Sequence, residues 1–156
     1  MTPEIPGFQL LREIGKGGMG MVYLARREKD DAQVAIKVLP PNLLTSNSAR
    51  RFQREGRALQ SVKHPNIVEV YDTNAVQGLH YLVMEYLEGS PLSRIVRTRG
   101  GGLPVDEALH YARSVGAALA EIHGRGMTHR DLASRTFSPP ALSRALSSPG
   151  LTSLRQ

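Results

Sequence analysis

The 156-residue sequence contains no cysteine, which excludes disulfide bonds and zinc sites built on thiolates. It has no apolar run long enough to span a bilayer. The opening MTPEIPGFQLL carries an early acid and lacks the basic segment followed by an apolar one that marks a signal peptide. No internal repeat is present. We therefore expect one cytoplasmic domain with a sizeable core and no membrane segment.

The formal net charge is +6, which by itself would suit a nucleic-acid partner. No aromatic residues are interleaved with a basic patch, as a single-strand binder would need. After Asp131 the chain contains Arg135, Arg144 and Arg155 but no carboxylate, so this stretch supplies three of the six charges. The charge therefore reflects an unusual end of the sequence, and we expect no nucleic-acid partner.

Residues 8–86 predict a small β-rich region with one helix. Runs of β-type residues cover 8–15, 21–28, 33–39, 67–76 and 79–87. The glycine-rich KGGMG at 16–20 marks a tight turn, and Gln77-Gly78 is a hairpin signal. Apolar residues at helical spacing, with Phe52, Leu59 and Val62 among them, predict a helix over about 49–62. The prediction is an α+β fold with a five-stranded antiparallel sheet and one helix.

The second part of the chain is expected to be helical and then irregular. Residues 91–99 predict a short basic helix, and 99–102 a glycine-rich loop. Residues 106–123 carry an apolar stripe at helical spacing, formed by Ala108, Tyr111, Val115, Ala118, Leu119 and Ile122. From residue 133 onward serine, leucine, proline and arginine follow one another without a period. We expect residues 136–156 to be an unstructured tail.

The most distinctive motif is Gly15-Lys16-Gly17-Gly18-Met19-Gly20-Met21-Val22, which fits the pattern GxGxxGxV. Glycines allow a backbone to come close to phosphates and to present its N–H groups to them. Many glycine-rich turns do nothing more than turn, so the motif alone has little specificity. Its place between two strands argues against a dinucleotide-binding fold, in which a helix should follow the glycines.

Two charged residues could complete a phosphate site. Lys37 ends the apolar run Val-Ala-Ile-Lys, where burying an unpaired ammonium group would be costly. It is either an edge-strand lysine that points to water or a phosphate ligand held by a carboxylate. Glu55 is a candidate for that carboxylate, although a glutamate in the middle of an arginine-rich helix is also typical of a solvated surface.

Six motifs in the same order indicate a family. They are GxGxxGxV at 15–22, VAIK at 34–37, FxRE at 52–55, HPNIV at 64–68, VMEYLEG at 83–89 and HRDL at 129–132. With these motifs the chain resembles the protein kinase family, and the sequence of its N-terminal part resembles that of the bacterial Ser/Thr kinases. The resemblance covers residues 8–135. It implies a kinase N-lobe at about 8–86 and an incomplete helical C-lobe at about 90–135.

The resemblance implies ATP as a ligand and a protein Ser or Thr hydroxyl as the acceptor. It implies an ATP site formed by Ile14, Gly15, Lys16, Gly17, Gly18, Met19, Gly20, Met21, Val22, Ala35, Lys37, Met84, Glu85 and Leu87. Lys37 would hold the α- and β-phosphates while paired with Glu55. Asp131 would accept the proton of the acceptor hydroxyl, Arg135 would steady the transferred phosphoryl group, and His129 would have a packing role.

The catalytic loop departs from the family pattern after Arg135. Leu132-Ala133-Ser134-Arg135 resembles the HRDLAxRN loop of tyrosine kinases, so a tyrosine acceptor stays open. The asparagine of that loop should fall at 136, where this chain has Thr136. In the family this asparagine and the aspartate of a DFG motif hold Mg²⁺, and the chain has neither, so no residue is assigned to a metal.

A single-base deletion would explain the tail. An ancestral Arg-Asn-Ile-Leu written as CGA-AAC-ATT-CTC becomes CGA-ACA-TTC-TC after the loss of one A, and it then reads Arg-Thr-Phe-Ser, as residues 135–138 do. The alternative is a natural divergent tail. In either case we expect the chain as written to be an inactive or weak kinase. A non-catalytic ATP-binding or interaction module and a non-functional fragment stay open as alternatives.

Overall fold

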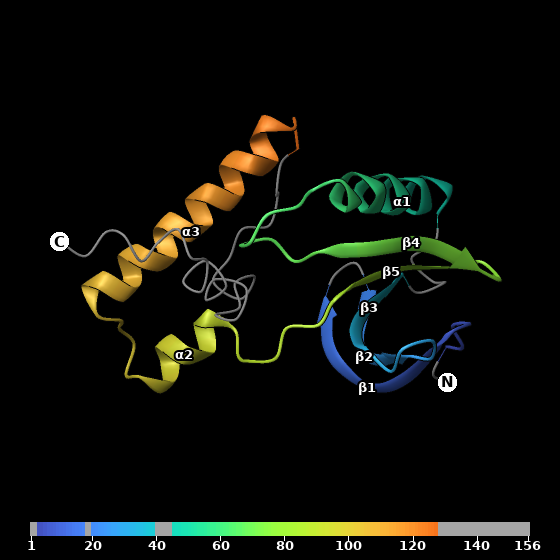
Figure 1. Cartoon of the computed structure of the whole chain (residues 1–156), viewed down its shortest axis with the longest axis horizontal. Helices are drawn as coiled ribbons and strands as arrows, with labels where there is room; N and C mark the ends of the chain where they lie inside the picture. The colour runs from blue at the N-terminus through green and yellow to red at the C-terminus, as the bar shows by residue number, and fades with distance from the viewer. Residues whose placement is uncertain (1–2, 18–19, 40–44, 128–156) are drawn as a thin grey trace. The chain divides into compact units, whose positions relative to one another are not determined.

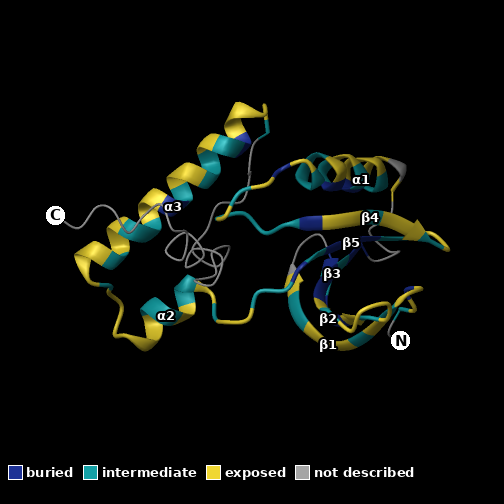
Figure 2. Ribbon diagram, viewed as in Figure 1, coloured by how far each residue is buried: buried dark blue, intermediate teal, exposed yellow. Residues whose placement is uncertain are grey.

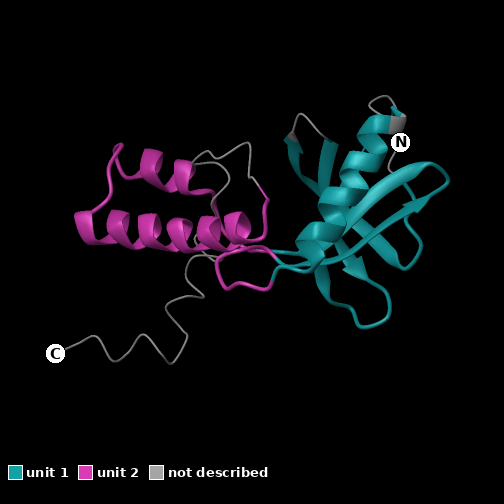
Figure 3. Cartoon of the chain, turned by 90° about the horizontal axis from the view of Figure 1, so that it is seen from above, with its two compact units in different colours: residues 1–62, 69–86 teal, residues 63–68, 87–156 magenta. Residues whose placement is uncertain are grey.

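The computed structural model describes residues 3–17, 20–39 and 45–127. These residues form two compact units (Figure 3). The first unit contains the described residues up to 62 together with 69–86, and the second contains 63–68 and the described residues from 87 onward. The expected tail, residues 136–156, lies outside the described residues.

A five-stranded sheet is the centre of the first unit (Figure 1). Its strands are β1 (Phe8–Gly17), β2 (Gly20–Arg27), β3 (Gln33–Leu39), β4 (Val70–Val76) and β5 (Leu79–Glu85). They lie in the order β1-β2-β3-β5-β4, and every neighbouring pair is antiparallel. The five-stranded antiparallel sheet expected from the sequence is confirmed.

The last two strands are joined by the tight turn that the sequence indicated. Gln77 and Gly78 both have positive φ angles, 47° and 80°, as a two-residue hairpin turn that matches the twist of its strands requires. The expected strand over 67–76 is too long, because β4 begins only at Val70. Before it, Ile67 N–H donates to the His64 carbonyl at 3.1 Å and closes a turn that contains Pro65.

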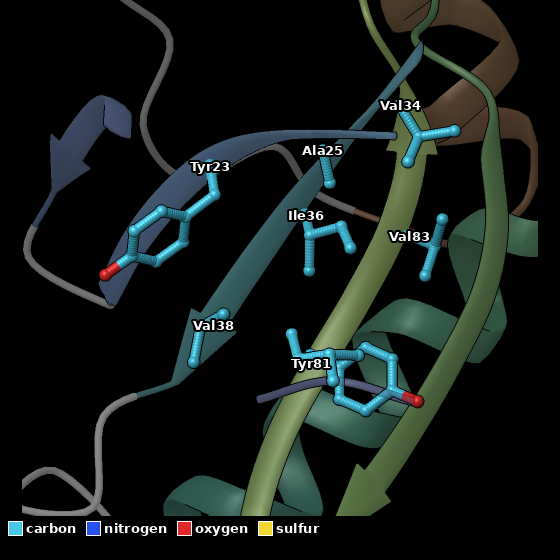
Figure 4. Packing of buried hydrophobic residues seen from close by; sticks show 8 residues of the cluster. Tyr23, Ala25, Val34, Ile36, Val38, Tyr81 and Val83 are labelled. Atoms are coloured by element: carbon cyan, nitrogen blue, oxygen red, sulfur yellow. The ribbon is translucent and has the colours of Figure 1, made fainter. Parts of the chain in front are cut away.

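Alternation along the strands gives the sheet two apolar faces. One face carries a buried cluster formed by Tyr23, Ala25, Val34, Ile36, Val38, Tyr81 and Val83 (Figure 4). Ile5 from the N-terminal segment belongs to the same cluster. The other face carries Leu39, Val70 and Leu82, which pack with Phe52 of the helix. Burial is concentrated on the inner strands, as Figure 2 shows. The sheet is therefore sandwiched between two layers of side chains, as an interior strand such as β3 requires.

Helix α1 (Ser46–Gln60) lies along β4 and β5 (Figure 1). It begins three residues earlier than the periodicity predicted. Thr45 Oγ1 accepts from the Ser48 N–H at 3.1 Å, and Ser48 Oγ accepts from the Thr45 N–H at 2.8 Å. This capping box satisfies N–H groups that a helix start leaves without partners, so helix extends through residues that carry no apolar signal.

The second unit contains α2 (Leu92–Thr98) and α3 (Val105–Gly124), both near their expected places. On the predicted stripe of α3, Ile122 is buried and Ala108 is exposed. Asn66 Nδ2 donates to the Ser114 carbonyl at 3.1 Å and ties the segment 63–68 to α3. Among the described residues, no helix is both long enough and apolar enough to cross a membrane.

Candidate active site

The glycine-rich motif forms the tip of the β1–β2 hairpin. Gly15 faces Val22, Lys16 faces Met21 and Gly17 faces Gly20 in the ladder. Gly20 has a φ of 133°, a conformation that side-chain-bearing residues rarely adopt. Gly18 and Met19, which the sequence assigned to the nucleotide, lie outside the described residues. The described part of the motif is thus the paired ends of two strands with small residues, suited to backbone contact with a phosphate.

The register of the sheet aligns this hairpin with Lys37. Gly15 faces Val22, Val22 faces Lys37, and Lys37 faces Leu82 on β5. Residues directly opposite one another in an antiparallel ladder point to the same face. The result is one cross-sheet row in which the glycine hairpin and the lysine share a face.

A second row runs parallel to the first, two residues along. Leu24 faces Ala35, and Ala35 faces Met84. Because side chains alternate along a strand, Ala35 shares a face with Lys37, and Met84 with Leu82. Val22, Ala35 and Met84, which the resemblance assigns to the ATP site, are therefore brought to the face that carries Lys37. An apolar surface beside a cationic group fits a base linked to phosphates.

Lys37 is an interior-strand residue, because β3 lies between β2 and β5. The alternative of an edge-strand lysine that points freely to water is therefore wrong. The side chain is half-buried. Within the described ranges it forms no ion pair, so an ammonium group is held at the site face without a fixed carboxylate.

The expected Lys37–Glu55 pair is not present. Glu55 Oε1 accepts instead from Arg51 Nε at 3.0 Å, one turn earlier on α1. The physical reason is local, since residues four apart on a helix are neighbours and need no tertiary arrangement to meet. Both side chains are more than two-fifths exposed, and such a pair contributes only about 0.3–0.5 kcal/mol. The Arg51 pair is therefore a weak competitor for the Glu55 carboxylate.

The end of β5 supplies the remaining assigned residues. Glu85 is 8% exposed, and its N–H donates to the Glu69 carbonyl at 2.9 Å. A nucleotide cannot take this N–H, so any adenine contact at Glu85 falls to its carbonyl oxygen. Leu87 follows the strand and is half-buried. Ile14 and Lys16 lie in β1, half-buried and exposed respectively.

Three further assigned residues, besides Gly18 and Met19, cannot be placed. His129, Asp131 and Arg135 lie outside the described residues, so their roles stay predictions. In turn, sequence reasoning missed Gly56, which lies buried in the middle of α1 against the sheet. A glycine in the interior of a helix is destabilising by itself, and this was the available signal.

A model of the protein kinase domain matches residues 8–135. The chain belongs to the protein kinase family. It is 41% identical over 126 residues to the serine/threonine-protein kinase PrkC of Bacillus subtilis, covering 80% of this chain and 19% of that protein. It is 41% identical over 133 residues to the serine/threonine-protein kinase PksC of Streptomyces coelicolor, covering 80% of this chain and 24% of the relative.

A solved structure agrees with the family. The crystal structure of the Mycobacterium tuberculosis PknI kinase domain matches with a TM-score of 0.72 at 33% identity, covering 83% of this chain and 53% of that one. The chain therefore spans about a fifth of the length of the curated kinases that it matches and about half of the solved kinase domain. The N-lobe-like sheet and helix expected from the resemblance are confirmed.

Proposed function

We propose that this chain carries the ATP-binding part of a Ser/Thr protein kinase. The observation that carries the proposal is the cross-sheet row Gly15–Val22–Lys37, which brings a glycine hairpin and a half-buried lysine to one face of the sheet. Relatives named serine/threonine-protein kinases, at about two-fifths identity, support a Ser/Thr acceptor. The proposed lobes are 8–86 and 90–135, close to the division between the two compact units.

The proposed roles follow the chemistry of each group. The backbone of 15–20 contacts the phosphates, and Lys37 neutralises charge on the α- and β-phosphates. Val22 and Ala35 pack on the adenine, Met84 takes the gatekeeper position, and Glu85 and Leu87 contact the adenine edge through the backbone. The Glu55 carboxylate exchanges its ion pair with Arg51 for one with Lys37 and so orients the lysine. In the transfer the acceptor oxygen bonds to the γ-phosphorus, the bond to the β–γ bridging oxygen breaks, ADP leaves, and Asp131 takes the hydroxyl proton.

Mg²⁺ supplies charge neutralisation between the phosphates in this chemistry. Thr136 stands where the resemblance places a metal-binding asparagine, and a threonine hydroxyl is a weaker ligand than an amide oxygen for this role. No step is assigned to a metal ligand of this chain. We therefore expect the transfer by this chain to be weak, with a protein Ser or Thr as acceptor and no nucleic-acid partner. We propose the cytoplasm as the compartment, because the proposed co-substrate is ATP.

A second function is favoured by a specific observation. Glu55 pairs with Arg51, and Lys37 has no carboxylate partner among the residues that the structure describes. In the sequence Thr136 replaces the expected asparagine. Both features suit a module that binds ATP without transferring its phosphate. The two functions share the binding step and differ only in the transfer.

Asp131→Asn separates the two functions. If the chain is a kinase, it transfers labelled γ-phosphate from ATP to Ser and Thr residues of a generic protein substrate. The variant should then lose about 10²–10⁴-fold of this rate, because it removes the proton acceptor. The ATP-induced rise of the unfolding temperature should stay, since Asp131 does not hold the nucleotide. A thermal shift without any labelling would establish the binding module, and the absence of both would contradict both proposals.

The proposal that a single-base deletion produced residues 136–156 can be tested by sequencing the gene. The family match ends at residue 135, next to Thr136, which supports a frame change at that junction. Sequencing independent clones across codons 135 and 136 and reading the alternative frame should reveal an Asn codon and, further on, Asp-Phe-Gly. An alternative frame that closes at once would show that residues 136–156 are a genuine divergent segment.

A further inference from the structure

We propose that Gly56 is a positioning residue for the nucleotide site, because it lets the backbone of α1 lie directly on the strand that faces Lys37. The inference rests on the proposed ATP-binding function, because its expected consequence is weaker binding of the ATP phosphates. It concerns a contact between α1, β4 and β5 that lies wholly inside the first unit.

The contact leaves no room for a side chain at Gly56 unless a neighbouring group shifts. A Cβ placed on Gly56 would lie 2.7 Å from Thr73 Oγ1 and 3.1 Å from Thr73 Cβ, and closer still to Leu82 Cδ2. Carbon atoms in contact are normally about 3.5–4.0 Å apart. Thr73 is β-branched and stiff, and Leu82 is 7% exposed within a buried cluster, so neither can retreat freely. An alanine at this position requires Thr73, Leu82 or the helix to shift, and we infer that the helix takes part of the shift.

The same contact lies in the row that carries Lys37. Leu82 faces Lys37 across the β3–β5 ladder, and Thr73 faces Leu82 across the β5–β4 ladder. Gly56 therefore packs on Leu82 and Thr73. These two residues extend the cross-sheet row that contains Lys37 to β4, at the edge of the sheet. Glu55 precedes Gly56 on the same helix, so a displacement of the backbone at Gly56 moves Glu55 relative to Lys37.

Two glutamines hold the helix on either side of this point. Gln53 Nε2 is 3.1 Å from His80 Nδ1 on β5, and Gln60 Nε2 donates to the Tyr71 carbonyl on β4 at 3.0 Å. Positions 53, 56 and 60 are spaced by three and four residues, so they share one face of α1. The glutamines fix the register of the helix, and the glycine fixes its distance from the sheet.

Gly56→Ala tests the proposal through the binding of two ligands, ATP and adenosine, to the full chain by calorimetry. Adenosine reports the base contacts, and ATP adds the phosphates that Lys37 would hold. We expect ATP affinity to fall about tenfold, a typical loss for a coupled contact, while adenosine affinity changes less than about twofold. In a Glu55→Gln background the same substitution should cause no further loss, because both act through one lysine.

The chain offers a matched control. Gly116 also lies inside a helix, and a Cβ there would meet nothing within 4 Å. Gly116→Ala should leave the affinities for both ligands unchanged. Adding Leu82→Val and Thr73→Ala to Gly56→Ala removes the atoms in the way and should recover ATP affinity. If Gly56→Ala does not fold, Gln60→Ala loosens the helix without a clash and should shift ATP affinity in the same direction, by less.

Several outcomes would overturn the proposal. These are an equal loss for ATP and adenosine, no loss for either ligand, or a loss fully additive with Glu55→Gln. If the wild-type chain binds neither ligand, the proposed function itself fails. The contact is then judged by thermal unfolding. A midpoint lowered by Gly56→Ala and restored by the two sheet substitutions supports the contact, and an unchanged midpoint refutes it.

Discussion

Replacing Lys37 by methionine is expected to abolish the ATP-dependent stabilisation of the chain while leaving its stability without nucleotide intact. Lys37 is half-buried on an interior strand and forms no ion pair among the described residues. Methionine has a similar length, keeps the apolar stem and removes the charge. Removing a half-buried ammonium group should not lower the free energy of unfolding of the chain without nucleotide. The substitution should therefore affect only the binding of the ATP phosphates.

The measurement is thermal unfolding with and without ATP. Nucleotide at about one hundred times its dissociation constant stabilises a folded chain by about 2.7 kcal/mol, which for a domain of this size is on the order of 10 °C. The variant should lose nearly all of this shift. Lys29→Met, at an exposed position of the β2–β3 turn, is the matched control and should keep the shift. An undiminished shift in Lys37→Met would place the nucleotide elsewhere.

Much of the sheet follows from short-range patterns. The run Gln33–Leu39 is a strand with the predicted bounds, because its apolar residues fill both faces of an interior strand. The Gln77-Gly78 turn follows from the positive φ angles that such a hairpin needs. These features are decided by neighbouring residues, so a single sequence contains the information for them.

The remaining differences arise where tertiary distance decides. The resemblance pairs Lys37 of one motif with Glu55 of another, and that pair requires the helix and the strand to come together in the fold. In this structure the local pair with Arg51, which needs no tertiary arrangement, holds the Glu55 carboxylate instead. The sequence also does not show which face of α1 approaches the sheet closely enough to require Gly56. The site face could be predicted from alternation, whereas the position of the helix above it could not.

Replacing Ile36 by alanine is expected to unfold much of the first unit. Ile36 is fully buried in the cluster on the face opposite Lys37, where it lies beside Val83 across the ladder (Figure 4). Removing three carbons from such a site costs about 2–5 kcal/mol, through lost burial and the cavity left behind. Small units have little stability to spare. Circular dichroism during urea unfolding should show a midpoint far below that of the wild-type chain.

Two further variants decide whether the loss comes from the core. Ile36→Val removes one carbon and should cost only about 0.5–1.5 kcal/mol, so the losses should rise with the volume removed. Leu11→Ala acts on a β1 side chain that is 45% exposed and should stay within about 0.5 kcal/mol of the wild-type chain. Equal losses for Ile36→Ala and Leu11→Ala would contradict the assigned faces. Because Ile36 and Lys37 are adjacent and point to opposite faces, one variant should remove stability and the other only the response to ATP.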